Sequence, residues 1–222
     1  MAISAKYSFI NGLFAQGDAN SEYDYIVPGF LDIHCHGGGG KYFSDGATTA
    51  IDTHKSAGTR IQIASLVTQE LETLKAQIKS LKNHEVFGIH LEGPYISKKY
   101  CGAHDPKLLR TPDIAEIKEL IAVGEGSIKM VTIAPELPGA ISVIDFLTSH
   151  GVVVAIGHSD ANASDTVAAI NAGATVVTHF NNAMRNLSFE GMNLWQVSDE
   201  IGILLIWVVI VYAIAFKVFK WE

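Results

Sequence analysis

Between Ile26 and His179 the sequence alternates short runs of β-branched apolar residues with longer amphipathic segments. This alternation predicts a parallel β-sheet covered by helices, because each helix returns the chain to the start of the next strand. A closed (β/α) barrel and a doubly wound open sheet both fit the pattern. No GxGxxG or GxxxxGK[ST] phosphate loop follows the first predicted strand, which weakens the nucleotide-binding version of the open sheet.

The predicted strands are short and apolar and lie at Ile26–His36, Arg60–Ser65, Val86–Leu91, Ile128–Ile133, Val152–Ile156 and Ala174–His179. The predicted helices alternate with them at Ala47–Ala57, Gln69–Leu81, Pro112–Ala122, Ile141–Ser149 and Ala161–Ala172. Spacings of three and four predict one apolar stripe on the second helix, formed by Leu71, Leu74 and Ile78. The last helix is expected to begin after Ser159 and Asp160, which are both good N-caps.

Charge and cysteine content exclude some classes of protein. A formal net charge of −7 argues against a nucleic-acid partner, which normally meets a basic face. Two cysteines, Cys35 and Cys101, are too few for a disulfide framework and suggest a reducing compartment. The first residues lack a basic start followed by an apolar core, so no secretory signal is predicted and we expect a cytoplasmic protein.

Polar residues at the ends of the predicted strands favour the barrel, which builds its active site at the carboxyl ends of its strands. The first strand ends in Asp32-Ile33-His34-Cys35-His36, so His34 and His36 share a face and Cys35 points away. Two imidazoles in this arrangement can bind one cation. Taken alone, the pair is equally compatible with two polar residues at a strand end.

The third, fifth and sixth strands also end in possible metal ligands. Glu92 follows an apolar strand, where a carboxylate is costly unless a cation or donor pairs with it. His158 and His179 each occupy the first polar position after a strand. Together with His34 and His36, these residues predict a metal centre.

Several other polar residues have open or ordinary interpretations. His90 lies on the same face as Glu92 and could support a ligand or contact a substrate. Glu136 follows the fourth strand and could be either solvated or functional. Three further histidines have polar neighbours in or beside helices and are expected at the surface: His54, His84 and His150.

Six motifs, in order and spacing, resemble the N-acetylglucosamine-6-phosphate deacetylase family of the amidohydrolase superfamily: PGFLDIHCHG, GIHLEGPY, CGAHDP, VTIAPE, VAIGHSDA and THFNNAM. The resemblance runs from about Pro28 to about Leu187. It implies an α/β fold with a partial TIM-like (β/α) barrel of about six βα units at 26–187. It also implies a remnant of a small β-sandwich at 1–25, followed by a divergent apolar tail at 188–222.

The same resemblance implies a ligand set and a reaction. Glu92, His158 and His179 match the ligands of a divalent cation such as zinc or iron, and His34 and His36 match a pair that can hold a second. The implied chemistry is metal-assisted hydrolysis of N-acetylglucosamine 6-phosphate to glucosamine 6-phosphate and acetate, in amino-sugar catabolism.

Substrate contacts and assembly are also implied. Ala103 and His104 match a loop that contacts the amino sugar, and Asn182 and Ala183 match further substrate contacts. The amino-sugar phosphate is the expected partner, and the family implies a homodimer. A substrate of the galactosamine type remains an alternative.

The sequence departs from the family after Leu187. The family has a catalytic aspartate on a later strand, and no such strand follows here; Asp199 precedes an apolar run and is not assigned the role. An inactive, truncated metal-binding fragment is therefore an alternative. The uncharged run Ile201–Phe216 is borderline for a membrane helix, so a membrane segment at 201–219, a core-covering segment and a reading-frame shift all remain open.

Overall fold

A computed structural model describes residues 5–10 and 13–185 of the 222-residue chain. Six strands form one sheet in the order β11-β10-β9-β8-β7-β4, and every neighbouring pair is parallel. The strands are β4 (Phe30–Cys35), β7 (Thr59–Val67), β8 (Gly88–Glu92), β9 (Ile128–Ile133), β10 (Val153–Ile156) and β11 (Val176–Val177). Within the described residues β4 and β11 are the edges of this sheet. The prediction of a partial barrel with about six βα units is confirmed.

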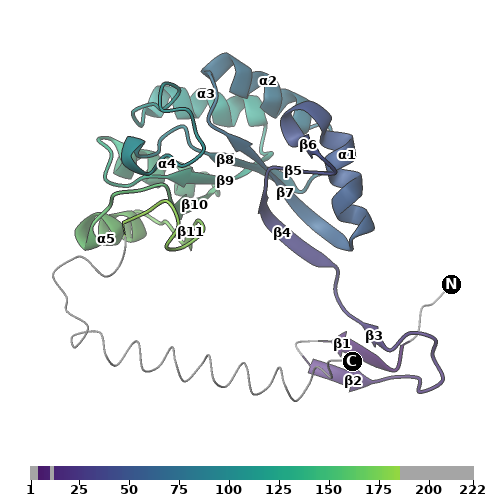
Figure 1. The fold of residues 1–222 in the computed structure, drawn as a ribbon. Coiled ribbons are helices and arrows are strands. Elements are labelled where there is room, and N and C mark those ends of the chain that lie inside the picture. The colour runs from purple at the N-terminus through teal and green to yellow at the C-terminus, as the bar shows by residue number, and fades with distance from the viewer. Residues whose placement is uncertain (1–4, 11–12, 186–222) are drawn as a thin grey trace.

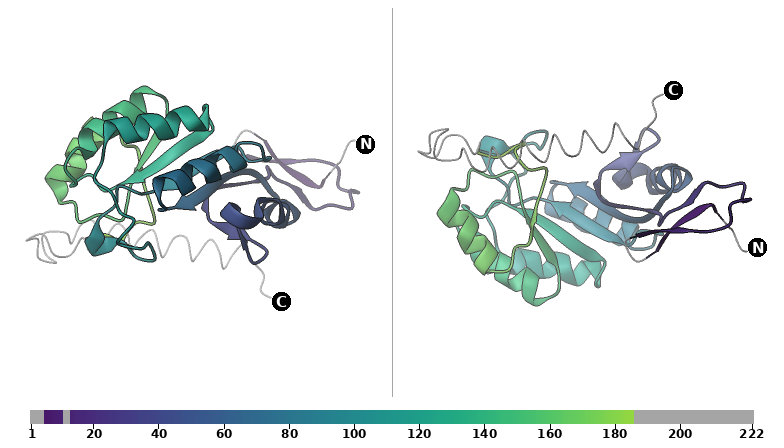
Figure 2. Two further views of the ribbon diagram at one scale, coloured as in Figure 1. Left: turned by 90° about the horizontal axis from the view of Figure 1, so that it is seen from above. Right: turned by 90° about the horizontal axis from the view of Figure 1, so that it is seen from below.

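Five helices lie along one side of the sheet, as Figure 1 shows and the two views of Figure 2 repeat. They are α1 (Phe43–Ser56), α2 (Leu71–Leu81), α3 (Ile114–Gly124), α4 (Ala140–Ser149) and α5 (Ala163–Asn171). The core between helices and strands contains the predicted stripe residues Leu74 and Ile78, together with Leu120 and Ile144. Burying each such side chain contributes about 1.5–3 kcal/mol, so the helices hold the strand ends in fixed positions.

The first predicted strand, Ile26–His36, is wrong as a single element. Tyr25–Ile26 forms β3 and pairs with β1 (Tyr7–Ile10), which also pairs with β2 (Leu13–Gln16). This three-stranded sheet lies apart from the parallel sheet in Figure 1. The break falls at Pro28, which has no N–H to donate to a strand ladder.

Two helices begin where local capping fixes them rather than where the apolar pattern begins. The Asp45 carboxylate accepts the backbone N–H of Tyr42, and α1 starts at Phe43 instead of Ala47. Asn162 and Asp165 exchange side-chain to backbone hydrogen bonds of 3.0 Å and cap α5. The helix therefore begins at Ala163 instead of Ala161, and its N-cap is Asn162 rather than Ser159 or Asp160.

A short hairpin connects β4 to α1. Its strands are β5 (Gly37–Gly38) and β6 (Lys41–Tyr42), and they pair antiparallel. The turn between them needs positive φ angles, +59° at Gly39 and +75° at Gly40, which glycine adopts readily. The hairpin thus places a tight turn directly beside His36.

Among the helices that the structure describes, none combines the length and the apolar character that crossing a membrane requires. The run Ile201–Phe216 lies outside the described residues. The alternatives for the tail at 188–222 therefore stay predictions.

Candidate metal centre

The Glu92 carboxylate, at the end of β8, is surrounded by imidazole nitrogens from other strand ends. Its Oε1 lies 3.1 Å from His158 Nε2 and 3.2 Å from His179 Nε2. Its Oε2 lies 3.0 Å from His36 Nε2, and His34 Nε2 is 3.4 Å from Oε1. Glu92 is only 3% exposed. The structure therefore brings together all five of the residues that the sequence suggests as metal ligands.

The hydrogen positions of His158 and His179 follow from their outer contacts. His158 Nδ1 donates to the carbonyl oxygen of Tyr100 (2.8 Å), and His179 Nδ1 donates to that of Asn182 (3.0 Å). A carbonyl oxygen only accepts, so in the neutral rings both Nε2 atoms present lone pairs. These two atoms are 3.1 Å apart and both face Glu92. A histidine that ligates a metal typically makes this kind of outer hydrogen bond.

Three electron-rich atoms meet here, two of them from the buried residues Glu92 and His158, and they repel one another unless a proton or a metal cation lies between them. Two imidazole nitrogens and one carboxylate oxygen are a donor set that suits zinc and similar divalent ions. The residues present therefore fit one divalent ion held by Glu92, His158 and His179.

The His34–His36 pair offers a second set of ligand atoms. Their Nε2 atoms are 3.2 Å apart, and Glu92 Oε2 completes a group whose ligand atoms lie within 4.8 Å of one another. His36 Nδ1 is buried without a hydrogen-bond partner among the described residues. Cys35 points away and accepts a hydrogen bond from Gln62 Nε2 (3.4 Å), as the strand alternation predicts.

The ionisation of Glu92 reflects its neighbours. Burial alone would raise the pKa of its carboxyl, but the surrounding imidazoles of His104, His158, His34 and His36 outweigh burial and hold the pKa well below its usual range. Glu92 therefore remains a carboxylate and can bind a cation.

His104 presents a different ring nitrogen to the centre. The backbone N–H of Thr68 donates to His104 Nδ1 (3.3 Å), so Nδ1 accepts and the neutral ring carries its proton on Nε2. This Nε2 lies 3.5 Å from Glu92 Oε2, and the side chain is buried. With this tautomer His104 can donate a hydrogen bond to a substrate; Glu92, His104 and His158 also lie close enough together to form a metal-binding group. Ala103, beside it on the same loop, is exposed.

The loops after β10 and β11 are paired with each other beside the centre. The backbone N–H of Ser159 donates to the carbonyl oxygen of Ala183 (3.2 Å), and that of Asn182 donates to His179 (2.9 Å). His158, His179 and Ala183 have positive φ angles of 49°, 32° and 48°. Such angles cost non-glycine residues about 1–3 kcal/mol each and cluster at functional sites.

The Glu136 carboxylate holds the loop after β10, a role that the sequence alone left undecided. It accepts hydrogen bonds from Ser159 Oγ (2.7 Å) and from the backbone N–H of Asp160 (2.6 Å). Glu136, which follows β9, therefore fixes the loop that begins at His158. The only sequence signal for it was its place after a strand.

His90 is completely buried and supports the centre from below. It lies between Ser65 Oγ (2.9 Å) and Thr132 Oγ1 (2.8 Å), and its ring packs edge-on against His34 at 4.7 Å. Burial, with the nearby His34, lowers the pKa of His90 to about 3, so the ring is neutral at ordinary pH. His90 therefore packs against His34 while two hydroxyl groups hold its ring.

His54 is not a surface residue, and that prediction is wrong. It is half-buried, and its Nε2 lies 3.0 Å from the carbonyl oxygen of Gly37. His84 is also half-buried, whereas His150 is exposed as expected. The helical position of His54 gave no signal of this contact, because its partner lies in the hairpin before α1.

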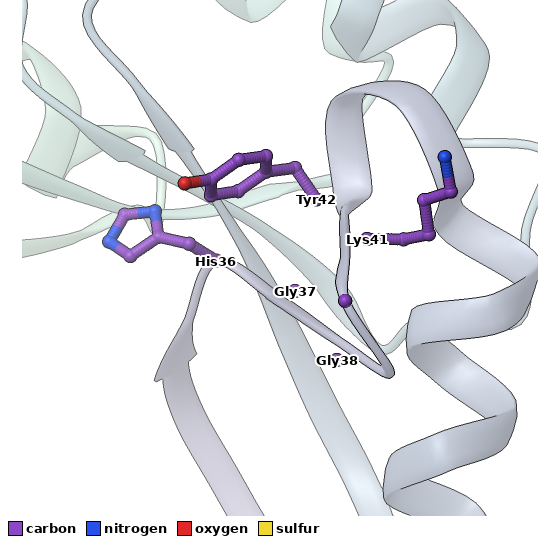
Figure 3. Close-up of a pocket in the computed structure, with 6 residues that line it drawn as sticks. His36, Gly37, Gly38, Lys41 and Tyr42 are labelled. Carbon is purple, nitrogen blue, oxygen red and sulfur yellow. The ribbon is translucent and has the colours of Figure 1, made fainter.

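An open cavity of about 430 Å³ adjoins the centre. Its lining consists of His36, Gly37, Gly38, Gly40, Lys41 and Tyr42. In Figure 3 the side chains of His36 and Tyr42 extend to the same side of the hairpin, whereas Lys41 extends to the other side. A cavity of this volume can accommodate a small organic ligand.

Comparison with known proteins gives the family. The model of the amidohydrolase family matches residues 25–206. The chain is 36% identical over 176 residues to the N-acetylgalactosamine-6-phosphate deacetylase of Escherichia coli O157:H7. This alignment covers 74% of this chain and 47% of that protein. The chain is 32% identical over 173 residues to the N-acetylglucosamine-6-phosphate deacetylase of Lysinibacillus sphaericus, with 72% and 45% covered.

A solved structure gives the same result. The N-acetyl-D-glucosamine-6-phosphate deacetylase of Mycobacterium smegmatis superposes with a TM-score of 0.78 at 38% identity, covering 83% of this chain and 57% of that one. The chain spans about half the length of the curated relatives it matches. By its sequence, its fold and its match to the family model, the chain belongs to the amidohydrolase family.

Proposed function

We propose that this chain carries the metal-binding part of a hydrolase that removes the acetyl group from N-acetylglucosamine 6-phosphate. The observation that supports this most is the Glu92 carboxylate, which meets imidazole nitrogens from three other strand ends within 3.4 Å. Relatives that bear this activity in their names match the same part of the chain.

Each residue of the centre has a distinct task in the proposed reaction. Glu92, His158 and His179 would hold one divalent ion, and His34 and His36 a second. When bound there, a divalent ion would supply the Lewis acidity that polarises an acyl oxygen and makes water a better nucleophile. The family is generally metal-dependent, and we propose zinc or iron as the ion.

His104 and the loop after β11 would handle the substrate. The Nε2–H of His104 is directed into the centre and can donate a hydrogen bond to an acyl or hydroxyl oxygen. Asn182 and Ala183 would contact the sugar; the backbone N–H of Asn182 donates to the carbonyl oxygen of His179, and the carbonyl oxygen of Ala183 accepts the N–H of Ser159. Such contacts would orient the acetamido group, and orientation alone can lower a reaction barrier by several kcal/mol, on the order of 7–11.

The reaction also needs a group that passes a proton to the leaving amine. Glu136 and Asp160 are bound to neighbours, Glu136 to the loop after His158 and Asp160 to Lys99 and Arg185. Neither is assigned this role. An assay of the chain itself is therefore the decisive test of its activity.

The proposal also concerns which sugar epimer the protein acts on, N-acetylglucosamine or N-acetylgalactosamine 6-phosphate. The similarity to the Escherichia coli relative, which is named for N-acetylgalactosamine 6-phosphate, favours that epimer as the second candidate. Release of acetate and of a primary amine should be measured with both sugar phosphates in the presence of Zn²⁺, Fe²⁺ or Co²⁺. We expect metal-dependent release that Glu92→Gln abolishes. Metal-loaded, folded protein that releases acetate from neither sugar would contradict the proposal.

Two further proposals concern organisation. We propose that the three-stranded sheet is part of a small β-sandwich that includes residues 1–25, beside a barrel domain at 26–187. We also propose a homodimer, which light scattering on the purified chain would test by its mass.

A further inference from the structure

The backbone that carries His34 and His36 is held at three points by hydrogen bonds from outside its strand ladder. Asp32 Oδ1 accepts the N–H of His34 (3.1 Å), and the N–H of Phe43 donates to the carbonyl oxygen of His36 (3.0 Å). The third bond runs from His54 Nε2 to the carbonyl oxygen of Gly37 (3.0 Å). Because that oxygen only accepts, Nε2 carries a proton.

His54 is itself firmly placed. It lies in the last turn of α1, with its ring stacked on Phe43 at a centroid distance of 6.5 Å and its Nδ1 3.8 Å from Asp32 Oδ2. A Cβ at Gly38 would lie 3.0 Å from His54 Cδ2 and 3.1 Å from the carbonyl oxygen of Ala50. The hairpin therefore packs closely on α1, and glycine allows this approach.

The direction of an imidazole on a strand end depends on its own backbone. His34 and His36 must present two Nε2 atoms to one place, and a small rotation of the peptide after His36 would separate them. Figure 3 shows Gly37 and Gly38 leading directly from His36 into the hairpin. Two glycines in succession supply little rigidity of their own, so the rigidity must come from contacts.

We infer that His54 is a positioning residue, which fixes the His34–His36 pair for a divalent ion by holding the carbonyl of Gly37. The inference rests on the metal centre of the proposed function and assigns no catalytic role to His54. Outer hydrogen bonds of this kind typically change metal affinity by about 10–100-fold.

Asp32, Cys35 and His54 also lie close enough to form a metal-binding group of their own. The contacts favour the positioning role. Gln62 already donates to Cys35 Sγ, and the Asp32 carboxylate and His54 Nε2 each hold a backbone group of the same segment. A metal held by these three residues is therefore an outcome that the test must be able to detect.

The test is a Zn²⁺ titration of the full chain in competition with a chromophoric chelator. We expect two Zn²⁺ ions for the unaltered protein and one for the double variant H34A/H36A. His54→Leu should lower the affinity for one Zn²⁺ ion by about 10–100-fold, namely the ion that H34A/H36A no longer binds. The affinity for the other ion should not change. His54→Gln, whose amide N–H can reach the Gly37 carbonyl, should recover most of the lost affinity.

His150→Leu is the control, because His150 also lies at the end of a helix, α4, but its ring contacts Phe146 and Ser149 of that same helix. If His54→Leu does not fold, His54→Asn replaces it, since its shorter amide cannot reach Gly37. Thermal melts of the metal-free variants establish that they fold.

Three results would overturn the inference: a leucine or asparagine variant that binds both ions as the unaltered protein does, a glutamine variant as weak as these, or a third Zn²⁺ that only the His54 variants lose. An ion count that H34A/H36A leaves unchanged would overturn it as well. If the unaltered chain binds no Zn²⁺ through Glu92, His158 and His179, the proposed function fails too, which distinguishes the two failures.

Discussion

The Nε2 atoms of His158 and His179 lie 3.1 Å apart, and the other nitrogen of each ring donates to a backbone carbonyl oxygen. Two lone pairs therefore face each other across a gap that also borders Glu92 Oε1. Ordinary packing of neutral histidines would turn one ring to make a hydrogen bond. Here the outer carbonyls of Tyr100 and Asn182 hold both rings in the orientation that suits a cation.

Glu92→Gln should abolish binding of the ion held with His158 and His179. An amide oxygen is a weaker ligand than a carboxylate, and the charge that balances the ion is lost. We expect Zn²⁺ affinity to fall by more than about 100-fold, the upper end for loss of a supporting contact alone. Competition with a chelator measures this. Glu119→Gln, on an exposed face of α3, is the control, and equal Zn²⁺ affinities for the two variants would contradict the prediction.

Glu136→Ala should destabilise the fold as well as the centre. It leaves Ser159 Oγ and the N–H of Asp160 without their carboxylate acceptor, and hydrogen bonds to charged groups contribute about 1.5–3 kcal/mol. We expect the free energy of unfolding in urea to fall by about 2 kcal/mol. Glu119→Ala removes a surface ion pair with Lys75 and should lower the free energy of unfolding much less. Equal losses for the two variants would refute this role for Glu136.

Tyr95 should make the protein sensitive to alkaline pH. Burial, and then the charge of Glu116, raises the pKa of its hydroxyl, which donates to Glu116 Oε1 (3.0 Å). Above about pH 10 the unfolded chain loses this proton while the folded protein keeps it, so stability falls by about 1.4 kcal/mol per pH unit. Tyr95→Phe should show a smaller loss between pH 9 and pH 11. Urea unfolding with the same pH dependence for both proteins would contradict the prediction.

Cys35 should resist alkylation in the native protein. Burial, with a contribution from the nearby Asp32, raises the pKa of its thiol to about 12, and the thiolate is the form that reacts. Iodoacetamide at pH 8 should leave Cys35 unmodified until urea unfolds the chain, as mass mapping of peptides would show. Labelling of Cys35 at the same rate before and after unfolding would contradict the raised pKa of its thiol.

The sequence predicts which residues meet at the strand ends, because the proposed ligands follow local rules. Strand alternation places His34 and His36 on one face, and a carboxylate after an apolar strand needs a partner. Long-range partners follow no such rule. Glu136 contacts the loop after another strand, and His54 contacts a hairpin that precedes its own helix. Neither contact leaves a periodic signal in the chain.

Local sequence patterns also predict some boundaries of helices and strands but not others. The strand Ile128–Ile133 is predicted to the residue, because its apolar run and its ladder coincide. The start of α5 is not predicted, because four candidate caps stand close together in Ser159, Asp160, Asn162 and Ser164. Ser159 Oγ donates to Glu136, the Asp160 carboxylate binds Lys99 and Arg185, and Asn162 caps the helix.

The most direct test of the metal centre is anomalous diffraction from crystals of the full chain grown with Zn²⁺. We predict an anomalous peak at the zinc edge within bonding distance of Glu92 Oε1, His158 Nε2 and His179 Nε2, at about 2.0–2.2 Å. Zinc density at other residues only, or none at this place in zinc-soaked crystals, would contradict the assignment.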